Sequence, residues 1–410
     1  MADKMQFRND TAANWTSNNP ILAVAEPGLE YDTGMFKFGD GITHWNSLAY
    51  SGNTGATQTL AYRSYGDGSD GSQTISTQIT LASDMHYNNL TLAAGGQIIT
   101  NGWRIFVKGT LDLRNAIAGA IQNNGGNGAS GAAFFGGTGG TAPGANSLGG
   151  GSAGGTGGVG GVYGTGANGA TSSNVAVNGG TNGASGIGGA NGSGISGGTG
   201  GAAIGLGNMF PVRRWSTNFL LGATQIASGN GARGAGGGGG DGVSNYGGGG
   251  GGGGAGGGIV GIWANTILKG SSTAAYCIQA LGGNGGSGGN GGPDGNTGGG
   301  GGAGGGGGGW IYIATNNIAG AEAFSALAVD GGAGGSGGTG TGTGFGGNGG
   351  GGGTAGLITI FNALTGAGYN FVGPSSTTQY PDSLGTTAAS GIVVATGGTG
   401  GNALKLSVSL

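Results

Sequence analysis

Short apolar runs alternate with turn residues between positions 78 and 123. The runs are mostly six to nine residues apart, and they lie at residues 79–81, 90–92, 98–99, 105–107 and 111–113. Several are separated by glycine-containing turns, such as Asn101-Gly102 and Lys108-Gly109. Because so little chain lies between the runs, crossover helices do not fit. The pattern predicts a parallel β-solenoid or a tight meander.

A longer repeat begins after residue 123. Each unit has a glycine run, an apolar strand, a variable segment and a closing Gly-Gly-x-Gly-Gly motif, with strands expected at 259–264, 310–314 and 357–361. Ala264 and Ala314 are 50 residues apart, Trp310 and Leu357 are 47 apart, and Gly125-Gly126-Asn127-Gly128 looks like an earlier copy of the closing motif. A fixed period near 50 residues predicts stacked units.

Glycine accounts for 119 of the 410 residues. A collagen-like chain is excluded because only 7 residues are proline and no Gly-X-Y register is sustained. Disorder fits poorly, because hydrophobic residues reach 35% and the net charge is only −3. The glycine is therefore expected to have a structural role.

Glycine segments lack Cβ atoms, so they can approach one another at backbone distance and pair through N–H and C=O groups. Triplets such as Gly282-Gly283-Asn284 suit an extended helix with three residues per turn. The region resembles the polyglycine-II sandwiches of phage adhesin tips and of glycine-rich antifreeze proteins. This resemblance implies packed polyglycine-II helices, and flexible linkers between strands are the alternative.

The first fifty residues contain an ordered set of aromatic and turn residues. They include Met5-Gln6-Phe7-Arg8-Asn9-Asp10, Trp15, Asn19-Pro20-Ile21, Glu26-Pro27-Gly28, Asp32-Thr33-Gly34, Lys37-Phe38-Gly39-Asp40-Gly41, Trp45 and Tyr50. Turn dipeptides between short apolar runs predict short strands joined by tight turns. Phe36 and Phe38 alternate with Lys37, which predicts a strand with one aromatic face and one charged face.

This block resembles the N-terminal module of tailed-phage fibre and receptor-binding proteins, a family that includes the major tropism determinant. The resemblance implies a homotrimer whose N-terminal end docks on phage tail or baseplate proteins. The small size of the module also favours an oligomer, because fifty residues can hardly bury Trp15, Trp45 and Tyr50 alone. A small all-β domain of other origin is the alternative.

Charge is concentrated in the first 115 residues, which hold 7 of the 12 Lys and Arg and 10 of the 15 Asp and Glu. The nearly neutral remainder lacks the footprint of a nucleic-acid binder. The sequence contains no 18-residue apolar stretch, so membrane insertion is not expected. Cys277 lies in an apolar run, and a buried structural thiol is expected there.

Catalytic chemistry has little support in the sequence. His44 and His86 are the two histidines, and no nucleophile–base pair, metal-spaced cluster or cofactor motif accompanies them. Asp67 and Asp70 are expected in a plain turn, with a calcium loop as the alternative. The acids after residue 115 are Asp241, Asp294, Glu322, Asp330 and Asp382, and paired carboxylates for a glycosidase stay an alternative.

Binding residues are easier to propose. The longest island without glycine runs from 209 to 221 and holds Arg213, Arg214 and Trp215, residue types that are frequent in recognition hot spots. Single aromatics within glycine could project from loop tips, namely Phe134, Phe135, Tyr163, Tyr246 and Phe345. A role for the island in the core or in trimer contacts is the alternative.

The sequence thus predicts an all-β fold in four parts: an attachment module at 1–55, a linker at 56–77, a solenoid-like stalk at 78–123 and a glycine-rich distal domain at 124–410. The expected function is that of a phage tail fibre in the virion, adsorbing to a host surface glycan or outer-membrane protein. A purely structural fibre segment and a polysaccharide-degrading tailspike are the alternatives.

Overall fold

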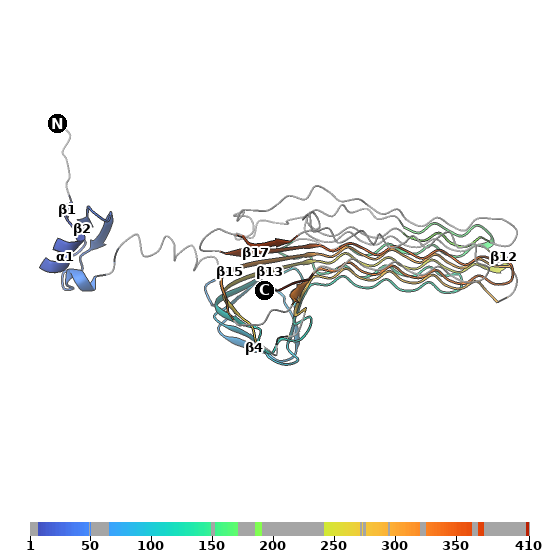
Figure 1. Ribbon diagram of the computed structural model, residues 1–410, viewed down its shortest axis with the longest axis horizontal. Coiled ribbons are helices and arrows are strands. Elements are labelled where there is room, and N and C mark those ends of the chain that lie inside the picture. The colour runs from blue at the N-terminus through green and yellow to red at the C-terminus, as the bar shows by residue number, and fades with distance from the viewer. Residues whose placement is uncertain are drawn as a thin grey trace, which may run out of the picture. The chain divides into compact units, whose positions relative to one another are not determined.

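Strands make up most of the regular structure, in agreement with the predicted all-β class (Figure 1). The computed structural model describes residues 7–48, 50, 65–148, 152–170, 185–190, 242–270, 273, 276–293, 296–319, 325–362, 368–372 and 407–409. The chain forms two compact units, Met1–Ser64 and Tyr65–Leu410. No helix in the described parts is long and apolar enough to cross a membrane.

The N-terminal unit combines a three-stranded sheet with two short helices. Its elements are β1 (Arg8–Asp10), α1 (Ala12–Asn18), β2 (Pro27–Glu30), β3 (Met35–Phe38) and the 3₁₀ helix η1 (Trp45–Ser47). The sequence predicted strands alone, and α1 is a correction. The helix forms because the Thr11 side chain caps its N-terminus by accepting a hydrogen bond from the Asn14 N–H, and because Trp15 supplies a buried anchor.

The aromatic and charged side chains of β3 lie on opposite faces, as predicted, and the charged side chain is the buried one. Lys37 is only 4% exposed, whereas Phe38 is exposed. The Lys37 Nζ donates a hydrogen bond to the Trp45 carbonyl oxygen at 2.7 Å and lies over the Tyr50 ring, 4.1 Å from its centroid. Burial lowers the pKa of Lys37 below its ordinary value, while the charge of the buried Glu30 acts in the opposite direction.

The two tryptophans of this unit are buried within one chain. The Trp15 and Trp45 rings stack with their centroids 4.1 Å apart, and Tyr50 packs against them from the side. Leu22 completes the cluster. The expectation that Trp15 and Trp45 need other subunits for burial is therefore wrong, because stacking lets two indoles share one small core.

The second unit is built around two mostly parallel sheets. The first contains β4 (Gln73–Ile75), β6 (Met85–Tyr87), β7 (Leu90–Leu92), β9 (Ile105–Asp112), β13 (Ile259–Leu268), β15 (Trp310–Ala319), β17 (Leu357–Asn362) and β18 (Gly368–Val372). The second contains β5 (Gln78–Thr80), β8 (Gln97–Ile99), β10 (Ile121–Gln122), β14 (Ile278–Gln279), β16 (Ser325–Ala328) and β19 (Ser407–Ser409). Among the described strands of these two sheets, only β18 and β19 pair antiparallel, with β17 and β16 respectively.

Successive turns of the chain contribute one strand to each sheet, as in β4–β5, β13–β14 and β15–β16. The apolar side chains between the sheets form one continuous core. β4 lies within the segment predicted as linker, and β13, β15 and β17 come from the segment predicted as the distal domain. The sheets therefore extend across both of these predicted boundaries.

The strand register confirms that the 50-residue units stack. Trp310 pairs with Leu357, as the repeat predicts. Ala264 pairs with Thr315, one residue beyond the Ala314 expected from the repeat. The early copy also stacks, because the Gly128 N–H donates to the Asn284 carbonyl oxygen and the Asn284 N–H donates to the Asn127 side chain.

Between a strand of the second sheet and the next strand of the first, the chain makes a long glycine-rich excursion. These excursions form the glycine array, which extends away from β13, β15 and β17 (Figure 1). Most of its described segments lie in three layers, parallel within a layer and antiparallel between layers, and residues 167–170 run antiparallel beside segment 152–161. The layers contain 123–132, 281–291 and 330–340; then 136–143, 247–258, 297–309 and 344–356; then 152–161 and 185–190.

The hydrogen bonds of the array repeat every three residues. In segment 247–258 the N–H groups of Gly248, Gly251 and Gly254 donate to segment 297–309. Those of Gly249, Gly252 and Ala255 donate to 123–132, and those of Gly250, Gly253 and Gly256 donate to 152–161. Segment 247–258 is thus bonded in three directions around its axis, and the N–H group of every one of its residues contributes.

Close approach, and not unusual backbone torsion, explains the glycine. No described glycine between Gly125 and Gly340 has a left-handed φ. A Cβ atom on Gly128 would overlap the carbonyl oxygen of Gly252, and one on Gly254 would overlap that of Gly283. A side chain at either position would therefore displace a hydrogen-bonded neighbour, whereas Ala255 and Ala303 occupy buried positions of the array that accept a Cβ atom.

Cys277 is buried in the core between the sheets, as predicted. Burial raises the pKa of the Cys277 thiol to about 12 from 9.0. Burial likewise raises the pKa of Tyr87 to about 12 from 10.0.

We expect Gly254→Ala to lower the melting temperature strongly, because overpacking costs about 1–3 kcal/mol and would separate two segments. Gly164→Ala is the matched control, since a Cβ there meets no atom within 4 Å. Thermal melts of the full chain followed by circular dichroism compare the two. Equal melting temperatures would contradict the steric explanation.

Stability is expected to fall as the pH rises above about 9. The unfolded Cys277 thiol loses its proton near 9.0 and the folded thiol only near 12, so the folded state holds one more proton in this window. The free energy of unfolding then drops by about 1.4 kcal/mol per pH unit. Urea unfolding at about pH 8, 9 and 10 measures this slope, which Cys277→Ala should remove between 9 and 10. An unchanged slope in the variant would contradict this assignment.

Candidate recognition site at the tip of the glycine array

The described excursions turn back at one end of the array, which we call the tip. The turns lie at 132–136, 161–165, 242–247, 289–298 and 339–346, apart from the undescribed 294–295. Backbone hydrogen bonds hold neighbouring turns together. The Phe134 N–H donates to the Gly247 carbonyl oxygen, the Gly247 N–H to that of Gly161, and the Gly299 N–H to that of Phe345. Residues distant in sequence therefore meet at the tip.

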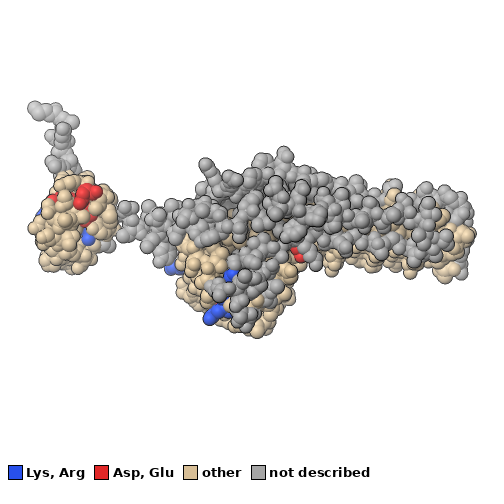
Figure 2. Space-filling model, viewed as in Figure 1, with Lys and Arg blue, Asp and Glu red and all other residues tan. Residues whose placement is uncertain are grey.

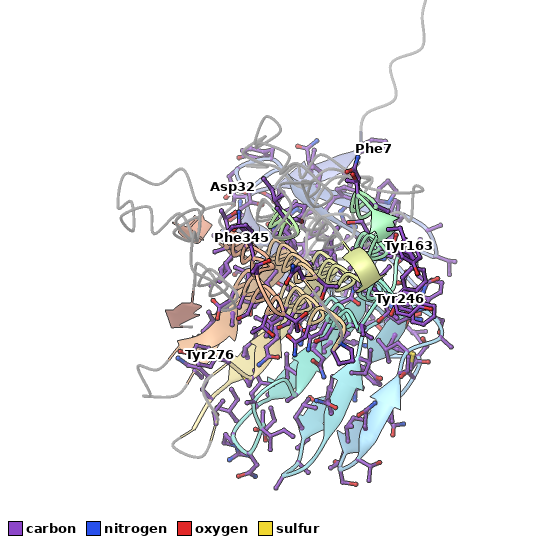
Figure 3. All side chains as sticks on the ribbon, turned by 90° about the vertical axis from the view of Figure 1, so that its right-hand side faces the viewer. Phe7, Asp32, Tyr163, Tyr246, Tyr276 and Phe345 are labelled. Atoms are coloured by element: carbon purple, nitrogen blue, oxygen red, sulfur yellow. The ribbon has the colours of Figure 1, made fainter. Side chains whose placement is uncertain are left out.

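Four of the predicted aromatic residues lie together there, and we call them the tip cluster: Phe134, Phe135, Tyr163 and Tyr246. The Phe134 ring centroid lies 5.2 Å from that of Phe135 and 5.1 Å from that of Tyr246. Tyr163 is on β11 (Val162–Gly164), which pairs antiparallel with β12 (Gly242–Tyr246), and Val162 lies opposite Tyr246. The end-on view in Figure 3 shows Tyr163 and Tyr246 on the same side.

The tip cluster is exposed although the Phe134 ring contacts those of Phe135 and Tyr246. The exposed fractions are 66% for Phe135, 76% for Tyr163 and 49% for Tyr246. Phe134 is half-buried beneath them. The cluster therefore presents several aromatic side chains to solvent from a hydrogen-bonded support.

Phe345 occupies another part of the tip. Its N–H donates to the Ala190 carbonyl oxygen, and its side chain is half-buried. In Figure 3 it lies on the side opposite Tyr163 and Tyr246. Arg213, Arg214 and Trp215 lie outside the described residues, and the described chain on either side of them ends at Ala190 and resumes at Gly242 in the tip.

The described tip turns contain no Lys, Arg, Asp or Glu. In Figure 2 the tan residues at the far end of the array carry no blue or red atoms on the face shown. Asp241 and Asp294 lie outside the described residues. Electrostatics in the described part of the tip therefore comes from backbone dipoles and neutral side chains.

No candidate metal centre is found in the part of the chain that the structure describes. Asp67 and Asp70 form turn contacts, since the Asp67 Oδ1 accepts from the Ser69 N–H and the Asp70 Oδ2 accepts from the His86 N–H. These hydrogen bonds agree with the plain turn expected from the sequence. Asp330 is the only one of the five late acids within the described residues, so the carboxylates considered for a glycosidase are not brought together there.

Sequence reasoning missed the valines beside the aromatics. Val159 and Val162 are exposed on the outer face of segment 152–161 and its continuation. They occupy every third position after Ala153 and Thr156, which are also exposed. This threefold periodicity is the signal that could have identified them, because a three-residue helical turn places such positions on one face.

Comparison with known proteins gives one match. Residues 5–43 match the family model described as the major tropism determinant N-terminal domain. No curated protein and no solved structure matches the chain significantly. The matched segment lies within the N-terminal unit and includes β1 to β3, and it indicates a phage protein of the tropism-determinant or tail-fibre type that is associated with the virion.

Proposed function

We propose that this chain is a phage tail fibre protein that attaches to the tail or baseplate by its N-terminal unit and contacts the host surface with the tip of its glycine array. The observation that carries the proposal is the match at residues 5–43 in the same chain as an exposed tip cluster. The attachment signal and the exposed aromatics lie in separate compact units. A division of labour between docking and adsorption is consistent with this arrangement.

The glycine array is inferred to be a sandwich of polyglycine-II helices on a parallel β-solenoid. Hydrogen bonds to three neighbours in rotation support the first assignment, because a helix with three residues per turn points successive N–H groups 120° apart. Alternation of successive strands between two parallel sheets supports the second. The assembly would be a stiff support for the tip.

A homotrimer is part of the proposal. The N-terminal unit exposes large apolar side chains, which commonly mark an interaction surface: Phe7, Ile21, Val24, Tyr31, Phe38 and Ile42. Three chains would also present three tips, so weak single contacts would multiply into stable adsorption.

Two other functions are open to test. A purely structural fibre segment would leave the receptor site to another protein. A tailspike would use paired carboxylates to cleave a host polysaccharide. The exposed aromatic tip favours binding, because exposed rings commonly mark an interaction surface and a spacer gains nothing from them.

Light scattering of the purified full chain should give three times its mass of 38.2 kDa. The physical reason is burial of the apolar surface of the N-terminal unit. Ile42→Glu should lower the measured mass, and the Tyr276→Ala change in the other unit should leave it unchanged. A monomeric wild-type chain would refute the trimer.

The full chain should block adsorption of the phage that encodes it when added to host cells beforehand. Replacing Arg213, Arg214 and Trp215 with Ala, or Phe135 and Tyr246 with Ala, tests the two predicted surfaces separately. Residual phage counts and circular dichroism distinguish lost contact from lost fold. Shortening of purified host polysaccharide would identify a tailspike, and no effect of the wild-type chain on adsorption would favour a structural segment.

A further inference from the structure

Two members of the tip cluster have a backbone conformation that side chains disfavour. Phe134 has a φ of 80° and Tyr163 a φ of 56°, both in the left-handed region. Such a conformation costs roughly 1–2 kcal/mol for a residue with a Cβ atom, and glycine avoids the cost. Glycine lies within three residues on either side of both positions, at 131 and 136 around Phe134 and at 161 and 164 around Tyr163. Aromatic residues at these positions are therefore best explained by what their rings contact.

The exposed area of the cluster suits a small ligand. An aromatic side chain offers about 200 Å², so the exposed fractions of Phe135, Tyr163 and Tyr246 correspond to roughly 400 Å². A stable protein–protein interface needs about 800 Å² from each partner. The cluster by itself reaches half of that value, whereas one or two sugar rings are covered by one or two aromatic faces.

The chemistry of the cluster suits an uncharged ligand. The turns that carry it, 132–136, 161–165 and 242–247, contain no charged residue. Aromatic faces are electron-rich and attract the weakly positive C–H groups of a sugar ring, and the hydroxyls of Tyr163 and Tyr246 can bond to sugar hydroxyls. A charged ligand would lose hydration against these described turns without gaining an opposite charge from them.

We propose that the tip cluster binds an uncharged saccharide by stacking against Phe135, Tyr163 and Tyr246. This inference rests on the proposed adsorption function and specifies its ligand. Phe134 is a positioning residue, because its ring contacts Phe135 and Tyr246 from a half-buried place. The rigid array fixes the spacing of the rings, so the ligand binds without ordering a loop.

The test measures binding of the full chain to immobilised, uncharged bacterial polysaccharides, with acidic polysaccharides as a separate set. Tyr163→Gly removes one ring and relieves the left-handed backbone, so it should weaken binding about tenfold or more while the melting temperature stays equal or rises. Tyr276→Gly is the matched control, because Tyr276 also has a φ of 56° and is 42% exposed. It lies between β13 and β14 of the core sheets and not in a tip turn. Phe135→Ala should also weaken binding, and it leaves the backbone unchanged because Phe135 is not in the left-handed region.

Support requires binding to at least one uncharged polysaccharide that survives about 1 M NaCl, falls in Tyr163→Gly and Phe135→Ala, and persists in Tyr276→Gly. Binding only to acidic polysaccharides, loss at high salt, or equal loss in all three variants would overturn the inference. If the chain adsorbs to host cells but binds no polysaccharide, and protease treatment of the cells abolishes adsorption, the ligand is a protein and only the saccharide inference fails. A chain that binds neither cells nor polysaccharides fails both proposals.

Discussion

Backbone hydrogen bonding in three directions is the constraint on which the glycine array depends. A β-sheet bonds its strands in one plane and leaves the other direction to side chains. In segment 247–258 the third direction is also taken by N–H and C=O groups, so Gly254 has no room for a Cβ atom. The interior of the array is consequently a core made mostly of backbone, with small side chains such as those of Ala255 and Ala303, and its composition follows from its bonding.

The two sheets supply the hydrophobic free energy that the glycine array lacks. Ordering glycine costs more conformational entropy than ordering any other residue, and burial of backbone contributes little hydrophobic free energy. The core between the sheets, with residues such as Ile262 and Ile313, provides that free energy at the base of each excursion. The paired strands β13, β15 and β17 also set the register in which their attached glycine segments meet.

Periodic features could be predicted from the sequence, and singular ones could not. The short strands and the 50-residue stacking follow from repeated spacing, which survives an error of one residue at Ala264. The buried position of Lys37 depends on the Trp45 carbonyl that η1 brings to it, and α1 depends on one cap and one indole. Phe134 and Tyr246 are far apart in the sequence, and only the folding of the excursions brings them into contact.

The triplet bonding of the array has a consequence for how far the tip can reach. Segment 247–258 contains four triplets, and in the proposed polyglycine-II helix each three-residue turn would advance about 9 Å along the axis. Insertion of a single residue into one segment would rotate all later N–H groups away from their partners. Length can therefore change only in whole triplets added to neighbouring segments together. Related chains with such an array should differ in reach by steps of about 9 Å, while their sheets and tip turns stay the same.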